Sequence, residues 1–120
     1  MAKVTITKEA APVDAAPTRA TFTDKLGRSI TIKKMGALDR MKLFEAVGSE
    51  RSQNEMYFGY ASLAASVVDI DGEAIMRPAN HLQIEALVQR LGDEGLEAIA
   101  TQYAAKWGAA AGLNAEAAKN

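Results

Sequence analysis

The stretch TFTDKLGRSITIKKMGALDRMKLFEAVG, residues 21–48, decides the fold class, because the spacing of its apolar residues changes partway along. Residues 21–33 are rich in β-branched side chains and are divided by the turn residues Lys25-Leu26-Gly27, which predicts a β-hairpin. Ile30 and Ile32 are two positions apart and share one face of the second strand. We therefore expect a hairpin with one half-buried side.

The second part of the stretch, Ala37 to Val47, has apolar residues at helical spacing and predicts an amphipathic helix. Gly48 is suited to end this helix, because glycine adopts a positive φ at little steric cost. The stripe expected to face the core consists of Leu38, Met41, Phe44 and Val47.

A second helix is predicted from about Gln53 to Val68. Ser52 and Glu55 have the spacing of a capping box, in which a hydroxyl and a carboxylate satisfy backbone amides at a helix start. The segment is apolar on nearly all sides, which is typical of a central helix. Ser62 and Ser66 lie one turn apart, and we expect their hydroxyls to bond back to the helix backbone.

The residues after this helix contain an Asp-Gly pair, Asp71-Gly72, between two short β-prone runs. Such a pair favours a tight hairpin turn, and its strands are candidates to extend the first hairpin. The run Asp69-Ile70-Asp71-Gly72 also resembles the start of a calcium loop. Its spacing is wrong for calcium, because the closing carboxylate would fall on Pro78.

Two more helices complete the expected order of elements. Asn80 is a plausible N-cap, with Gln83 three residues on, and Gly92 ends the third helix. Asp93 is placed to cap a fourth helix. The apolar stripes expected on the third and fourth helices are Ile84, Leu87, Val88 and Leu91, and then Leu96, Ile99, Ala100, Tyr103 and Trp107. The fold class is therefore α+β, with about four helices and one or two small β-hairpins.

The chain divides into one domain and two appendages. Residues 21–107 hold 29 of the 34 large apolar side chains among the 120 residues, so we expect them to form a single α+β domain. Residues 1–20 have six alanines and little to bury, which predicts a flexible segment with a stray strand at Lys3 to Thr7. Residues 108–120 form an Ala-rich tail that could extend a helix or fray.

Charge and cysteine content exclude several classes of protein. The formal net charge is −1, and residues 21–107 carry −2, so no basic surface favours nucleic acid or an anionic membrane. Cysteine is absent, which excludes disulfides and thiolate sites. The N-terminus lacks the apolar core of a signal peptide, and we expect a soluble cytosolic protein.

The sequence has no candidate catalytic, metal-binding or cofactor-binding residues. His81 stands alone without cysteine, and none of the serines lies in a nucleophile-elbow sequence. The nine glycines form no phosphate-binding motif. We therefore predict a protein that is not an enzyme and needs no cofactor.

The aromatic residues are the remaining candidates for function. Tyr57, Phe58 and Tyr60 crowd one helix, which cannot turn all three toward one core, and Trp107 closes the last helix. Ordinary core packing is one interpretation of Tyr57 and Trp107. The other is a partner-binding or self-association surface, for which Tyr57, Tyr60 and Trp107 are the candidate residues.

Five strings of the sequence carry a resemblance to a known family: LDRMKLFEAVG (38–48), YASLAASV (60–67), DIDG (69–72), QIEALV (83–88) and LGDEGL (91–96). Through them, residues 21–107 resemble the tail assembly chaperones of long-tailed bacteriophages and prophages. The resemblance implies a non-enzymatic protein in the cytoplasm of the infected bacterium. Such a protein binds the tape measure protein, keeps its long apolar helices soluble and recruits tail tube protein subunits. It also implies, in many relatives, a longer frameshifted form.

Two other functions stay open at this point. A structural virion component, such as a tail-tube or head-tail joining subunit, would also be small, free of cysteine and self-associating. A small DNA-binding regulator is disfavoured by the acidic body, because phosphates would repel it.

Overall fold

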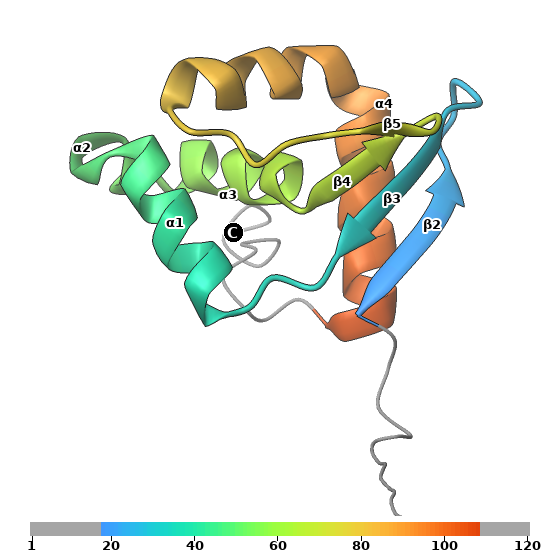
Figure 1. Ribbon diagram of the computed structural model, residues 1–120, viewed down its shortest axis with the longest axis horizontal. Coiled ribbons are helices and arrows are strands. Elements are labelled where there is room, and N and C mark those ends of the chain that lie inside the picture. The colour runs from blue at the N-terminus through green and yellow to red at the C-terminus, as the bar shows by residue number, and fades with distance from the viewer. Residues whose placement is uncertain (1–17, 109–120) are drawn as a thin grey trace, which may run out of the picture.

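The computed structural model describes residues 18–108, and these form an α+β fold of four strands and four helices, as predicted (Figure 1). The strands form one antiparallel sheet in the order β2 (Arg19–Thr23), β3 (Ser29–Lys33), β4 (Val67–Ile70) and β5 (Glu73–Ala74). The helices are α1 (Ala37–Val47), α2 (Ser49–Ser52), α3 (Glu55–Ala65) and α4 (His81–Trp107). The strand predicted at residues 3–7 and the tail residues 109–120 lie outside the described residues.

The first hairpin, β2–β3, is confirmed. Ile30 and Ile32 are fully buried on one face of β3, and Gly27 supplies the positive φ of the turn. Strand β2 begins at Arg19, two residues before the predicted start of the domain at Thr21. Ala20 pairs with Ile32 and is itself buried, so the sheet includes the end of the segment expected to be flexible.

The second hairpin, β4–β5, is also confirmed and extends the first, because β4 pairs with β3. Asp71 and Gly72 both have a positive φ, as the tight turn of a two-residue hairpin requires. The amide of Gly72 donates to Asp69 Oδ2 at 2.9 Å, and the amide of Ser29 donates to Asp71 Oδ1 at 2.8 Å. Both carboxylates therefore serve the turn and its attachment to β3.

The predicted end of the second helix at Val68 is wrong, because α3 ends at Ala65 and Val67 begins β4. The carbonyl of Ser66 accepts a hydrogen bond of 2.8 Å from the Lys33 amide, which ties this point of the chain to the sheet. The sequence hides this change, since a buried helix and a buried strand are both apolar throughout. The two serines behave as predicted: Ser62 Oγ donates to the Phe58 carbonyl and Ser66 Oγ to the Leu63 carbonyl.

The predicted capping box at Ser52 is wrong, although α1 has the predicted bounds and ends at Gly48 with φ +93°. Residues 49–52 form an extra helical turn, α2, and Ser52 Oγ donates to the Gly48 carbonyl at 2.7 Å. The N-cap of α3 is Asn54, whose Oδ1 accepts from the Tyr57 amide at 3.0 Å. Ser52 is therefore already used within α2.

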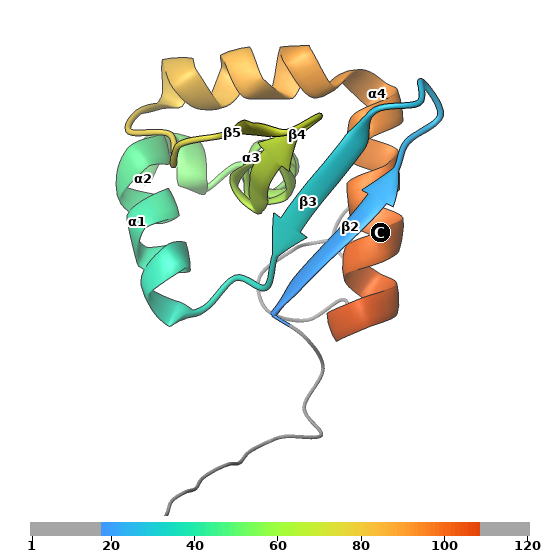
Figure 2. The same ribbon diagram turned by 45° about the vertical axis from the view of Figure 1, so that its right-hand side comes forward.

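Helix α4 contains both predicted C-terminal helices, joined at a sharp bend at Gly92 (Figures 1 and 2). Asn80 caps its start as predicted, since Asn80 Oδ1 accepts from the Gln83 amide at 3.0 Å. Gly92 has φ +68° and ψ −179°, a conformation that L side chains rarely adopt. The bend places the first half of α4 beside α3 and the second half against the sheet (Figure 2).

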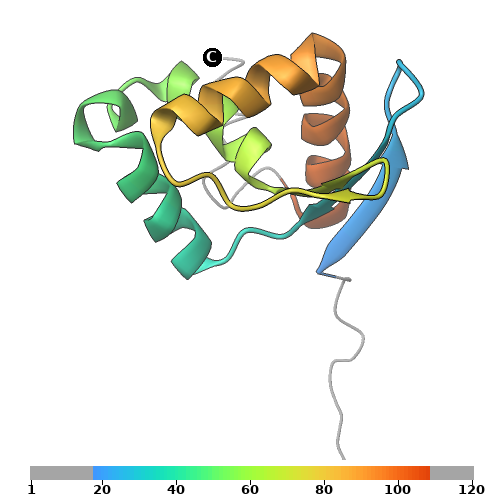
Figure 3. The same cartoon turned by 45° about the horizontal axis from the view of Figure 1, so that its top comes forward.

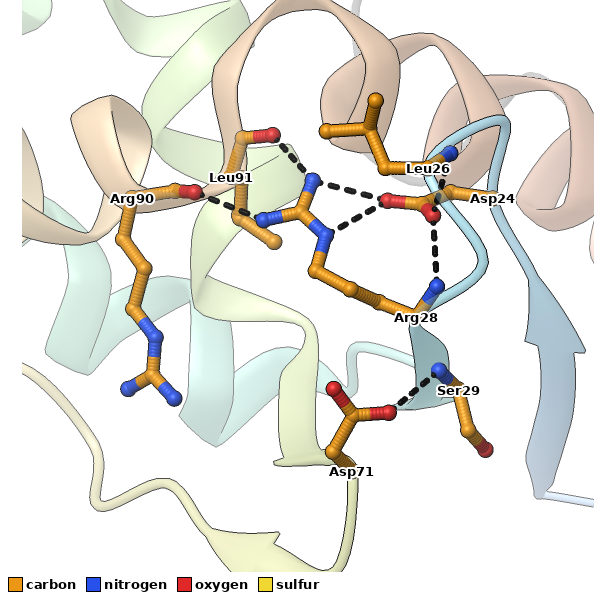
Figure 4. A network of polar contacts seen from close by, with 7 residues as sticks. All are labelled: Asp24, Leu26, Arg28, Ser29, Asp71, Arg90 and Leu91. Carbon is orange, nitrogen blue, oxygen red and sulfur yellow. Dashed lines mark hydrogen bonds and ion pairs between the residues drawn. The ribbon is translucent and has the colours of Figure 1, made fainter.

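Arg28 fixes the bend from the β2–β3 turn (Figure 4). Its guanidinium donates to the carbonyls of Arg90 at 2.8 Å and Leu91 at 2.6 Å, which end the first half of α4. The same group pairs with Asp24, whose side chain is fully buried. Burial by itself raises the pKa of Asp24. Hydrogen bonds from Arg28 and from the Leu26 amide lower it by a larger amount, so the pKa lies below its usual value. We call Asp24 and Arg28 the α4 clamp.

The core lies between the sheet, α3 and α4. Its largest fully buried side chains include Tyr103, Ile30, Ile32, Ile84, Leu91, Ile99 and Val47. The Tyr103 hydroxyl accepts a hydrogen bond of 2.9 Å from the Met35 amide, so even this polar atom is satisfied. The stripe predicted on the fourth helix is confirmed for Leu96, Ile99 and Tyr103, which are buried.

Candidate partner-binding surface

The structure turns three large apolar side chains of α1 toward solvent. Leu38 is 59% exposed, Met41 67% and Phe44 51%. The predicted core stripe is therefore wrong for these residues, and of its members only Val47 is buried. Leu43 takes their place in the core. We call Leu38, Met41 and Phe44 the α1 stripe.

Polar contacts at the start of α1 help to set which face of the helix is buried. Asp39 Oδ1 accepts from Lys33 Nζ at 2.8 Å and from Arg77 Nη2 at 3.1 Å, while its Oδ2 accepts from the Gly36 amide. Burial by itself raises the pKa of Asp39, but the bonds from Lys33 and Gly36 lower it more, so its pKa lies below the usual value. Asp39 therefore faces the body of the molecule, and its neighbour Leu38 faces water.

The α1 stripe is attached to the body at its C-terminal end. Phe44 contacts Phe58 of α3 edge to face, with 6.0 Å between the ring centroids. Lys42 and Glu45, both at least half exposed, form a loose ion pair of 3.7 Å on the same helix. The exposed surface of α1 thus combines the apolar stripe with a neighbouring pair of opposite charges.

A second apolar surface is the α3–α4 groove, a hollow of about 180 Å³ lined by Tyr57, Tyr60, Ala61, Ile84, Glu85, Val88 and Gln89. Tyr57 is half-buried and its hydroxyl donates to Glu85 Oε2 at 2.7 Å. Burial, together with this carboxylate, raises the pKa of Tyr57. Tyr60 is 49% exposed at the same groove.

The predicted partner-binding residues therefore fall in two places. Tyr57 and Tyr60 line one groove, whereas Trp107 lies at the end of α4 and packs edge to face on Tyr103, with 4.8 Å between ring centroids. Trp107 is half-buried and does not line the groove. The structure brings together two of the three.

The exposure of the α1 stripe could not be predicted from the sequence, because α1 carries apolar residues on more than one side. Leu43 and Val47 form an i, i+4 pair that competes with the stripe Leu38, Met41 and Phe44. A helix with more apolar residues than one face holds must expose some of them. The surplus of apolar residues in α1 was therefore the feature of the sequence that could have indicated an exposed apolar surface.

Within residues 18–108, no three His, Cys, Asp or Glu side chains come together in a way that could hold a metal ion. His81 lies half-buried in the first turn of α4. None of the helices between residues 18 and 108 is long and apolar enough to cross a membrane.

Comparison with known proteins gives no family assignment: no protein-family model, curated protein or solved structure matches this chain.

Proposed function

We propose that this chain is a phage tail assembly chaperone that is not an enzyme. It would bind the tape measure protein in the cytoplasm of the host bacterium, keep that protein soluble and help to recruit the tail tube protein. Two observations support the proposal. The sequence strings that resemble this family span residues 38–96, and one of them forms α1, whose apolar stripe faces water.

The exposed α1 stripe is the observation that carries the proposal. Its residues recur every three positions over about 9 Å of helix, which suits contact with an apolar face of a partner helix. Covering one such side chain contributes about 1.5–3 kcal/mol when it is removed fully from water. Methionine adapts its shape to irregular surfaces, so Met41 is suited to a client with repeated, non-identical apolar helices.

The charges near the stripe favour an apolar client over a charged one. Lys42 and Glu45 have opposite signs and lie beside each other, so α1 presents little net charge. Binding of a partner would be driven by the apolar area that it buries, with little electrostatic steering. Tyr57 and Tyr60 in the α3–α4 groove remain predicted contacts of the same partner.

Co-expression with the cognate tape measure protein tests the proposal. We expect the chain to raise the soluble yield of that protein severalfold, and the double variant Leu38→Ser, Met41→Ser to lose most of this gain. Leu26→Ser is the matched control, because Leu26 is 62% exposed in the β2–β3 turn, on the side of the molecule away from α1 (Figure 3). Its gain should equal that of the wild type.

Each outcome has a separate meaning. No gain with the wild-type chain contradicts the chaperone function, whereas an equal gain with the double variant contradicts only the role of the α1 stripe. Light scattering on the purified mixture measures the mass of the complex, and several copies per tape measure protein are expected. Tubes or rings of this chain alone, or its presence in purified virions, would instead indicate a structural virion component.

A further inference from the structure

A single residue, Gly92, joins the two halves of α4, because it is the one residue within that helix whose backbone is not helical. Residues 81–91 and 93–107 are helical on either side of it. Rotation of φ and ψ at Gly92 to helical values would merge the halves into one helix of 27 residues, about 40 Å long. We call these two arrangements the bent form and the straight form of α4.

Two glycines are needed in the bent form and not in the straight form. Gly92 has φ +68°, which is unfavourable for residues with a side chain. A Cβ atom added at Gly95 would lie 3.0 Å from Leu91 Cβ and 3.1 Å from Arg28 Nη2, closer than in ordinary contacts. In a straight helix the Cβ atoms of residues four apart are about 5–6 Å from each other, so the crowding between positions 91 and 95 would disappear. Alanine at either glycine should therefore favour the straight form.

The hydrogen bonds at the bend can be exchanged for those of a straight helix. In the bent form, the carbonyls of Arg90 and Leu91 accept from the Arg28 guanidinium (Figure 4). In a straight helix the same two carbonyls would accept from the amides of Glu94 and Gly95, four residues further along the chain. Straightening therefore replaces two hydrogen bonds at these carbonyls by two others.

Straightening would take the second half of α4 away from the sheet of its own chain. Leu96, Ile99 and Tyr103, which are buried there, would become exposed, and the sheet would lose its cover. A second copy in the straight form lacks the same cover and offers the same apolar contacts. Short, strained connections favour such an exchange of identical elements between copies.

We propose that Gly92 is the hinge of a domain exchange, in which α4 straightens and residues 93–107 of two copies pack on each other's sheets. The contacts that this half makes with the sheet side are then remade between copies, including the hydrogen bond of 2.9 Å from the Met35 amide to the Tyr103 hydroxyl. The free energies of the two forms therefore differ mainly at the hinge and in the entropy of association. The exchange does not rest on the proposed function, because the α1 stripe takes no part in it.

Light scattering on the refolded full chain tests the exchange. Unfolding in urea and refolding at millimolar protein concentration allow the second half of α4 to separate before it packs again. We expect a dimer-to-monomer ratio at least about tenfold higher in Gly92→Ala and in Gly95→Ala than in the wild type at the same concentration.

Gly72→Ala is the matched control for backbone strain. Gly72 has φ +86° in the β4–β5 turn, outside α4, and a Cβ atom there would meet nothing within 4 Å. Its dimer-to-monomer ratio should match that of the wild type. A dimer no more abundant in Gly92→Ala and Gly95→Ala than in this control would overturn the proposal, and Gly95→Ala decides alone where Gly92→Ala does not fold.

A cross-link identifies which chain supplies the second half of α4, since the protein has no cysteine of its own. Lys25 Nζ in the β2–β3 turn and Glu97 Oε1 in that half lie 3.2 Å apart, and both side chains are more than half exposed. In Lys25→Cys, Glu97→Cys, a short bismaleimide should link the monomer within one chain and the refolded dimer between two chains. Links within single chains of the dimer would mean that two unexchanged copies associate, and would contradict the exchange.

Discussion

The sheet side of the molecule and the α1 side use apolar residues in opposite ways. Ile30 of β3 and Ile99 of α4 are fully buried, whereas Leu38 and Met41 of α1 are more than half exposed. Burial on the sheet side removes apolar area from water and stabilises the fold. The exposed side chains of Leu38 and Met41 contribute little to that stability, so their apolar surface is available to a partner.

Truncation of the core should produce the largest effect. Ile99 is fully buried, so Ile99→Ala leaves a cavity in the core, and we expect a loss of about 2–5 kcal/mol in the free energy of unfolding. Met41→Ala is the control and should stay within about 0.5 kcal/mol of the wild type. Urea unfolding measures both. Equal losses would mean that the two sides do not differ in the way described.

Removal of the α4 clamp comes next. Arg28→Ala removes the guanidinium from two helix carbonyls and from the buried Asp24 carboxylate, which keeps only its backbone amide donors. We expect a loss of about 3 kcal/mol in the same unfolding experiment. Arg28→Lys keeps the charge but not the forked set of donors, so it should fall between Arg28→Ala and the wild type. A loss below about 1 kcal/mol for Arg28→Ala would show that the bend at Gly92 holds without the clamp.

The same variant should change the pH dependence of stability. The pKa of Asp24 is lower in the folded state than its usual 3.8, so its ionised form stabilises the fold above that pH. This contribution is lost as the pH falls below 3.8 toward the folded pKa. The acid loss should be smaller in Arg28→Ala but not absent, because Asp39 also has a lowered pKa.

The smallest effect on stability belongs to the α1 stripe. We expect Leu38→Ser, Met41→Ser to change the free energy of unfolding by no more than about 0.5 kcal/mol per residue, as for exposed positions elsewhere. Thermal unfolding of the chain without a partner measures this change. A loss above 2 kcal/mol would mean that the stripe packs within the domain, and the co-expression result would then report instability.

The order and type of most elements could be predicted, because alternation, helical spacing and turn residues are local signals. The β2–β3 hairpin, the Asp71-Gly72 turn and the Asn80 cap each depend on a few adjacent residues. The end of α3 could not be predicted in this way. Whether Val67 continues a helix or starts a strand is decided by pairing with Ile32, 35 residues earlier in the chain.

The buried face of α1, at the candidate site, could not be predicted for the same reason. Its bounds follow from local spacing, but the face that it buries is tied to Asp39, which pairs with Arg77, 38 residues away. The α3–α4 groove likewise depends on the packing of two helices. Tyr57 and Tyr60 could therefore be suggested as surface residues, but the bond from Tyr57 to Glu85 could not. Trp107 could not be separated from them by sequence alone.

The α4 clamp also bears on the order in which the chain acquires its structure. Arg28 and the Leu91 carbonyl are separated by 63 positions, and contacts of such long range form only after a large loop has closed. The β2–β3 hairpin has neighbouring strands and can form early. We expect the Arg28 guanidinium to pair with Asp24 once the hairpin has formed and to reach the Arg90 and Leu91 carbonyls only when α4 packs. The bend at Gly92 would then be fixed late in folding.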